Sequence, residues 1–97
     1  MLMLVTYDVR TLDTAGQRRL RRVARACLDY GQRVQNSVFE CEVDPAQWVA
    51  LRARLLDEID PRADSLRFYR LGADGRRRCE HVGAKPTLDL DGGALVF

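Results

Sequence analysis

The chain has 97 residues and a mass of 11.1 kDa, the size of one small domain. Hydrophobic residues make up 46% and charged residues 31%, a balance typical of a globular chain with a buried core. No apolar run approaches the roughly 20 residues that cross a bilayer, and the opening Met-Leu-Met-Leu-Val is too short for a signal peptide. We therefore expect a cytoplasmic domain with no membrane association.

Cysteine spacing and the type of basic residue bear on possible ligands. The three cysteines, Cys27, Cys41 and Cys79, share no metal-binding spacing, even together with His81, so we expect free thiols in a reducing compartment. The net charge is only +2, yet all the basic residues except Lys85 are arginines. Arginine binds phosphate in a planar, bidentate way, which favours nucleic acid as a ligand; the base composition of the genome explains the bias equally well.

The first 31 residues predict a strand and a helix. Residues 2–9 are apolar, β-branched and aromatic, a pattern typical of a buried strand ending at Tyr7-Asp8. Asp13 or Thr14 can cap a helix that runs to about Tyr30 and stops at Gly31. Its core face is predicted to carry Leu20, Val23, Ala24, Cys27 and Leu28. The opposite face carries Arg18, Arg22, Arg25 and Asp29, which is either a solvated surface or a binding surface.

The remaining segments predict a hairpin, a second helix and further strands. Residues 33–43 indicate β structure, with Asn36-Ser37 as a hairpin turn or a bulge. Asp44-Pro45 starts a helix that runs to about Ile59, with Trp48, Leu51, Leu55 and Ile59 facing inward. Residues 64–71 form an imperfect strand pattern, Asp74-Gly75 a turn, and residues 79–82 a short strand.

The order of these elements predicts the fold class. Strand, helix, two strands, helix and strand within residues 1–71 match the ferredoxin-like βαββαβ arrangement, an α+β fold, in a single domain over residues 1–97. Residues from about 79 to 97 form a C-terminal extension with an extra strand. Because the chain ends in the apolar Ala-Leu-Val-Phe, we expect the end to be tied down on a sheet edge of its own or another chain. The fold alone decides no activity.

Asp8 is the outstanding candidate for chemistry. It stands at the predicted carboxyl end of the first strand, where α/β sheets often place ligand groups. A carboxylate there can bind Mg²⁺, which prefers one or two carboxylates plus waters and phosphate oxygens; a cap of the following turn is the alternative. A two-fold dimer would bring two such residues together. Mg²⁺ could then activate water without a histidine base, in a chain with a single histidine and a single lysine.

Four segments of the chain resemble the CRISPR-associated Cas-two family, most closely its type I-C members. They are MLVTYDV, the arginine-rich LRRVARACLDYG, RVQNSVFE and the later DSLRFYRL. The resemblance implies a ferredoxin-like homodimer in which the C-terminal strand pairs with the partner protomer. It also implies a role in CRISPR adaptation, bridging dimers of the Cas-one integrase and holding spacer DNA, and a Mg²⁺-dependent endonuclease activity on single-stranded RNA or double-stranded DNA.

The resemblance also assigns roles to individual residues. It places the metal-binding and catalytic aspartate at Asp8, with Tyr7 beside it as a packing residue. Substrate-binding arginines of the family correspond to Arg22 and Arg33, to which we add Arg18 and Arg19 as nucleic-acid contacts. The family serine and phenylalanine correspond to Ser37, expected to hydrogen-bond the turn, and Phe39, expected in the core or a dimer interface. One helix arginine of some relatives falls on Leu20 here, with Arg19 and Arg21 adjacent.

Two functions of different class follow from these observations. The first is a Mg²⁺-dependent phosphodiesterase acting between two Asp8 carboxylates. The second is a non-catalytic dimer that holds duplex DNA electrostatically and bridges integrase dimers. Without the resemblance, the pattern is that of a ferredoxin-like RNA-binding or toxin-type ribonuclease domain.

Overall fold

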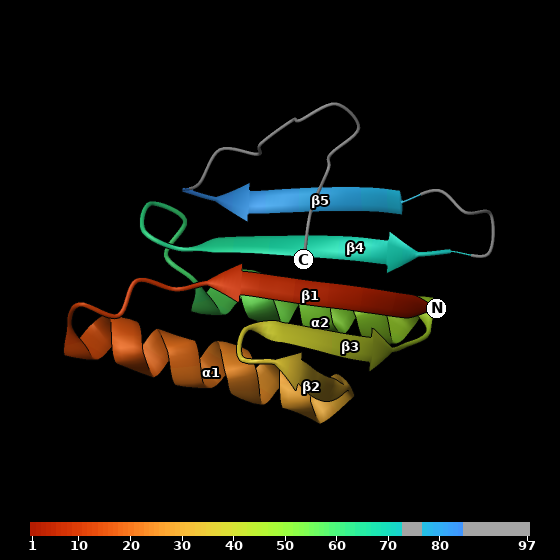
Figure 1. Cartoon of the computed structure of the whole chain (residues 1–97), viewed down its shortest axis with the longest axis horizontal. Helices are drawn as coiled ribbons and strands as arrows, with labels where there is room; N and C mark the ends of the chain where they lie inside the picture. The colour runs from red at the N-terminus through yellow and green to blue at the C-terminus, as the bar shows by residue number, and fades with distance from the viewer. Residues whose placement is uncertain (73–76, 85–97) are drawn as a thin grey trace.

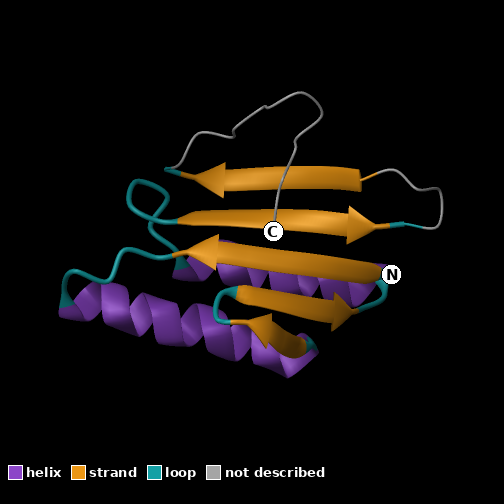
Figure 2. Ribbon diagram, viewed as in Figure 1, coloured by secondary structure: helices purple, strands orange, loops and turns teal. Residues whose placement is uncertain are grey.

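Two helices cover one face of a five-stranded sheet (Figures 1 and 2). The computed structural model describes residues 1–72 and 77–84. The elements in chain order are β1 (Leu2–Asp8), α1 (Thr14–Tyr30), β2 (Gln32–Gln35), β3 (Val38–Glu42), α2 (Pro45–Glu58), β4 (Ser65–Leu71) and β5 (Arg77–Gly83). The strands lie in the order β2-β3-β1-β4-β5 and every neighbouring pair is antiparallel. This confirms the α+β class and the predicted order of elements.

The pleat of the central strand β1 separates two chemical environments. Met3, Val5 and Tyr7 are buried, because they point to the side that the helices cover. The alternate residues, Leu2, Leu4, Thr6 and Asp8, point to the other side, which we call the open face. Residues paired across an antiparallel ladder share a face, so the register assigns each neighbouring strand's residues to one side or the other.

Both helices begin at the residues that the sequence predicts. Asp13 caps α1 by accepting a hydrogen bond from the backbone N–H of Gly16 at 2.7 Å. Asp44 caps α2 and forms a capping box with Gln47. At the end of α1, the N–H of Gly31 donates to the carbonyl of Cys27 at 2.9 Å, as the predicted stop requires.

The core face of α1 differs from the prediction at two positions. Val23, Ala26 and Cys27 are buried, whereas Leu28 is 49% exposed. At 3.6 residues per turn, Leu28 lies about 140° around the helix from Val23, and Ala26 only about 60°. Predicting Leu28 in the core was therefore wrong, and the small Ala26 was missed because its side chain gives a weak apolar signal.

The hairpin and the C-terminal region are placed as follows. Asn36-Ser37 forms the turn between β2 and β3, and a register shift lies between Arg33 and Gln35. The predicted strand at 79–82 is β5, which pairs with β4 of the same chain. The predicted turn at Asp74-Gly75 and the chain beyond residue 84 lie outside the described residues. Pairing of the C-terminal extension with a partner protomer stays a prediction.

Gly16 provides a test of how closely α1 packs on the chain that leaves β1. A β-carbon at Gly16 would overlap the backbone carbonyl of Arg10. Replacing a helical glycine by alanine ordinarily stabilises a helix by up to about 1 kcal/mol. We expect Gly16→Ala instead to lower the free energy of unfolding by about 1–3 kcal/mol, as overpacking does.

Urea denaturation followed through Trp48 fluorescence measures this effect. The matched control is Gln17→Ala at the neighbouring exposed position, which should leave stability unchanged or slightly raised. A Gly16→Ala protein as stable as the control would contradict this expectation, because it would show that α1 and the chain after β1 can move apart at no cost in stability.

Candidate nucleic-acid and metal site

Asp8 is the last residue of β1, and its exposed side chain is on the open face. It is paired in register with Ser65 of β4, which in turn is paired with Gly83 of β5. Asp13, not Asp8, caps the helix that follows. Asp8 therefore places an exposed carboxylate at the carboxyl end of the central strand, and carboxylate oxygens are among the ligands that Mg²⁺ prefers.

The strand register places Arg67 on the open face diagonally beside Asp8, and His81 one strand farther away. In the adjacent row, Thr6 is paired with Arg67 of β4, and Arg67 with His81 of β5. Burial and the charge of Arg67 lower the pKa of His81, so its imidazole is neutral at neutral pH. Sequence patterns did not single out Arg67, because only the pairing of β1 with β4 shows that it lies beside Asp8.

Tyr7 and Phe39 lie on the other side of the sheet, in the core. Their rings stack with centroids 6.0 Å apart and planes at 22°. The Tyr7 hydroxyl donates to the carbonyl of Asn36 at 3.4 Å, and the backbone N–H of Tyr7 donates to the carbonyl of Ser37 at 3.1 Å. Burial raises the pKa of Tyr7, so the hydroxyl stays protonated. The pleat thus separates Tyr7 from Asp8 although they are neighbours in sequence.

Arg33 belongs to the same cluster at the hairpin. Its guanidinium carbon lies 4.9 Å from the centroid of the Phe39 ring, a cation–π geometry. One terminal nitrogen donates to the carbonyl of Asn36 at 2.9 Å. Tyr7, Arg33, Ser37 and Phe39 are therefore brought together around the turn between β2 and β3. Arg33 remains exposed, and its contact with nucleic acid stays a prediction.

Four exposed arginines of α1 form a second candidate site, which we call the α1 arginine surface. Arg18, Arg21, Arg22 and Arg25 line a shallow hollow of about 630 Å³, together with Ala24 and Leu28. The side chains of Arg22 and Arg25 are 66% and 76% exposed, and their nearest carboxylates, Glu58 and Asp29, lie at 3.8 and 3.7 Å. Such exposed pairs are weak. These guanidinium groups can therefore exchange their carboxylate neighbours for phosphate oxygens.

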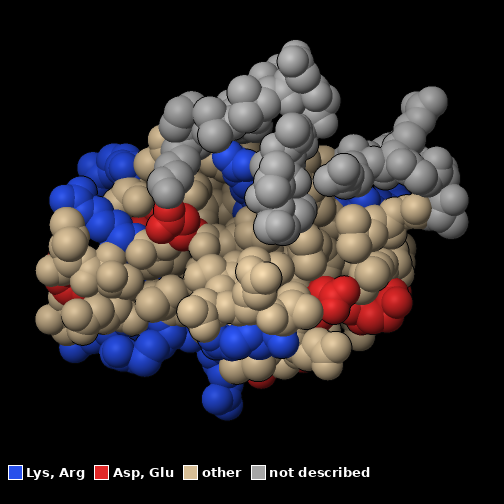
Figure 3. All heavy atoms as spheres, in the orientation of Figure 1, with Lys and Arg blue, Asp and Glu red and all other residues tan. Residues whose placement is uncertain are grey.

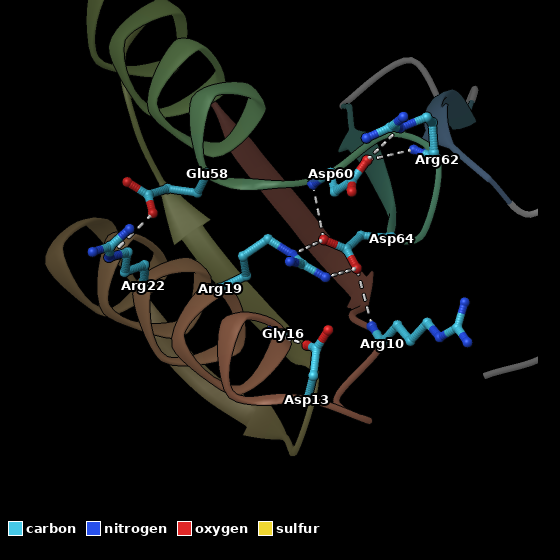
Figure 4. A network of polar contacts seen from close by, with 9 residues as sticks. All are labelled: Arg10, Asp13, Gly16, Arg19, Arg22, Glu58, Asp60, Arg62 and Asp64. Atoms are coloured by element: carbon cyan, nitrogen blue, oxygen red, sulfur yellow. Dashed lines mark hydrogen bonds and ion pairs between the residues drawn. The ribbon is translucent and has the colours of Figure 1, made fainter.

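Arg19 takes a different direction from its arginine neighbours. Its Nε donates to Oδ2 of Asp64 at 2.7 Å, and the Asp64 side chain is fully buried. The same carboxylate accepts the backbone N–H groups of Arg10 at 3.0 Å and Asp60 at 2.9 Å (Figure 4). The hydrogen bond with Asp64 raises the pKa of Arg19. A role of Arg19 in binding nucleic acid stays a prediction, and Asp64 is a residue that sequence reasoning missed.

The two buried cysteines are not suited to act as nucleophiles. Burial raises the pKa of Cys27 to about 12 and that of Cys41 to about 11, so both thiols are protonated at neutral pH.

The described residues contain no group of three or more histidine, cysteine, aspartate or glutamate side chains that could hold a metal ion. Within the same part of the chain, no helix is long and apolar enough to cross a membrane.

The charged side chains are unevenly spread over the molecule. Figure 3 looks onto the open face and shows basic side chains along the edge where Figure 1 places α1 and a further basic group above it at the left, with acidic groups in separate patches. Asp8 on the open face and the α1 arginine surface on the outer side of the helix layer therefore form two sites rather than one.

Comparison with known proteins gives a consistent result. A family model described as CRISPR associated protein Cas2 matches residues 1–79. A protein of Rhodospirillum rubrum called CRISPR-associated endoribonuclease Cas2 3 is 68% identical, with 98% of this chain and 100% of that protein covered. A protein of Halalkalibacterium halodurans called CRISPR-associated endonuclease Cas2 is 56% identical and fully covered, as is this chain.

The fold agrees with a solved member of the same family. The crystal structure of Streptococcus pyogenes Cas2 at pH 6.5 superposes with a TM-score of 0.70 and 61% identity, covering 74% of this chain and 87% of that one. The family model matches most of this chain, and the two relatives align with it almost from end to end. The chain therefore belongs to the CRISPR-associated Cas2 family, the Cas-two family that its sequence resembles.

Proposed function

We propose that the chain is a Mg²⁺-dependent endonuclease of CRISPR adaptation in which Asp8 holds the metal ion. The observation that carries this proposal is the exposed Asp8 carboxylate on the open face, at the end of the central strand. The names of the relatives support phosphodiester cleavage: the Rhodospirillum protein is called an endoribonuclease and the Halalkalibacterium protein an endonuclease. The substrate that we propose is single-stranded RNA or double-stranded DNA.

One carboxylate is a small ligand set for a catalytic metal ion. A homodimer that apposes two open faces would supply a second Asp8 and raise the set to two, which is enough for Mg²⁺ completed by waters and phosphate oxygens. When bound, Mg²⁺ supplies an activated water and stabilises charge on the phosphodiester. Asp8 would bind and orient the metal ion, while Arg67 beside it on the open face would offer a positive charge to the substrate backbone.

A second candidate function is a non-catalytic dimer that holds duplex DNA and bridges dimers of the Cas-one integrase. The specific observation in its favour is the α1 arginine surface, which lies on the outer side of the helix layer and does not include Asp8. Phosphate contacts of this kind are independent of sequence and give binding without cleavage. We also propose that the chain belongs to the type I-C subgroup of the family, because its α1 and β3 segments resemble members of that subgroup.

Replacing the proposed metal ligand tests the first function. We expect Asp8→Asn to lower Mg²⁺-dependent cleavage of labelled single-stranded RNA or duplex DNA by about 100-fold or more. Stability should change by less than about 0.5 kcal/mol, because Asp8 is exposed. The matched control is Asp57→Asn, which removes an exposed carboxylate from α2 and should cleave as the wild type does. Equal cleavage by wild type and Asp8→Asn, or cleavage that persists in EDTA, would reject the assigned site.

Replacing two arginines of α1 tests nucleic-acid binding. Arg18→Gln with Arg22→Gln should weaken duplex binding for all sequences and flatten the slope of log affinity against log salt by about 2, one for each phosphate that is no longer neutralised. Fluorescence anisotropy in EDTA measures binding without cleavage. The control with the same change of net charge is Arg62→Gln with Arg70→Gln, two exposed arginines outside α1. An equal flattening by the control pair would attribute binding to overall charge instead of this surface.

A further inference from the structure

The buried carboxylate of Asp64 joins three segments at one end of the sheet. Asp64 lies in the loop before β4, and its side chain is fully buried. It accepts two hydrogen bonds from the Arg19 guanidinium of α1, at 2.7 and 3.4 Å. It also accepts the N–H of Arg10, in the chain that leaves β1, and the N–H of Asp60, in the chain that leaves α2. The buried charge is thereby both neutralised and fully hydrogen-bonded, as a buried carboxylate requires.

This carboxylate holds the chain directly beside Asp8. Ser65, the next residue after Asp64, is paired with Asp8 across the β1–β4 ladder. Arg10, two residues after Asp8, gives its backbone N–H to Asp64 at 3.0 Å, and its side chain points away from the network in Figure 4. The strand end that carries Asp8 is thus fixed by the β1–β4 ladder at Asp8 itself and by the Asp64 carboxylate two residues later, at Arg10.

The surroundings of Arg19 favour this holding role over contact with a ligand. The Arg19 side chain is only 20% exposed, far less than the side chains of Arg22 and Arg25. Its Nε and one terminal nitrogen already donate to Asp64. A phosphate would have to compete with a buried carboxylate for the same donors, whereas Arg22 and Arg25 on the outer side of α1 are exposed and lie 3.8 and 3.7 Å from carboxylates that are only partly buried.

We propose that Arg19 and Asp64 form a positioning pair that fixes the end of β1 so that Asp8 presents its carboxylate on the open face. This inference rests on the proposed function, because it concerns how the proposed metal ligand is held. Metal and catalytic groups need placement to within about 0.5 Å. A misplacement of about 1 Å can lower a rate about 100-fold. The pair acts on Asp8 only through the backbone, and neither residue touches the substrate.

The first variant removes the charge of the buried carboxylate and keeps its shape. We expect Asp64→Asn to lower the maximal cleavage rate by about 10–100-fold and to raise the Mg²⁺ concentration at half-maximal activity. The affinity for duplex DNA in EDTA should match the wild type, because the α1 arginine surface is untouched. Arg19→Lys, which keeps a positive charge beside Asp64, should retain more activity than Arg19→Gln. Glu80→Gln is the matched control, since it breaks the ion pair of Glu80 with Arg52 between β5 and α2.

A second measurement reports on the strand end without any cleavage. Amide hydrogen exchange in the metal-free protein should be about 10-fold faster at Arg10 and its neighbours in Asp64→Asn than in the wild type, and unchanged there in Glu80→Gln. Urea denaturation shows which variants remain folded. If Asp64→Asn does not fold, Arg19→Gln takes its place in both measurements, because it removes the countercharge and leaves Asp64 and its two backbone donors intact; Arg19→Lys is then its conservative control.

The outcomes separate this inference from the proposed function. Wild-type cleavage and wild-type Mg²⁺ dependence in folded Asp64→Asn would overturn the positioning role while leaving Asp8 as the metal ligand. Loss of duplex binding in Arg19→Gln but not in Asp64→Asn would overturn it as well, and would make Arg19 a nucleic-acid contact. If the wild type shows no cleavage that depends on Asp8, the proposed nuclease is rejected; faster exchange at Arg10 then still supports the holding of this strand end, and unchanged exchange overturns it.

Discussion

The buried ion pair of Arg19 with Asp64 is the interaction on which one end of the structure depends. A fully buried carboxylate is tolerated only when its charge and its lone pairs are satisfied. Here α1 supplies the countercharge, and the loops after β1 and α2 supply backbone donors. The backbone of Asp64 is engaged too, because its carbonyl accepts the N–H of Ala84 at 2.9 Å.

This close packing explains why two glycines stand at the same end. Gly83 has a φ of 123°, a conformation that residues with a side chain rarely adopt, and a β-carbon there would overlap the carbonyl of Asp64. Gly16 meets the carbonyl of Arg10 in the same way. The chain that leaves β1, the start of α1 and the end of β5 are therefore all built around Asp64, and the position of Asp8 follows from them.

The elements were predictable from the sequence because their signals are local. The caps Asp13 and Asp44, the stop at Gly31 and the apolar run of β1 each act within a few residues, and Asp8 stands at the strand end that this run predicts. The ion pair of Arg19 with Asp64 joins residues 45 positions apart, so no local pattern indicates it. The place of Arg67 beside Asp8 likewise depends on the register of β4 against β1.

The arginine-rich segment of α1 shows why the composition of the chain could not tell an arginine in the buried network from one on the outer surface. Successive helical residues turn by about 100°, so Arg19 lies about 40° from the buried Val23, whereas Arg18 lies about 140° from it. Arg19 thus enters the buried network, and Arg18, the residue before it, lines the outer hollow. A count of arginines adds these two kinds together, although only the outer ones line the exposed hollow.

The same geometry separates the proposed binding site from the proposed cleavage site. The arginines on the outer side of α1 and Asp8 on the open face have the helix layer and the sheet between them. In a dimer that apposes two open faces, the paired Asp8 residues would be enclosed and the arginine surfaces would face outward. Duplex held on the outside would then not reach Asp8 by the same contact, so a chain of this architecture can hold DNA as a scaffold without cutting it. Cleavage would require a strand that enters between the two open faces, where Arg67 lies beside Asp8.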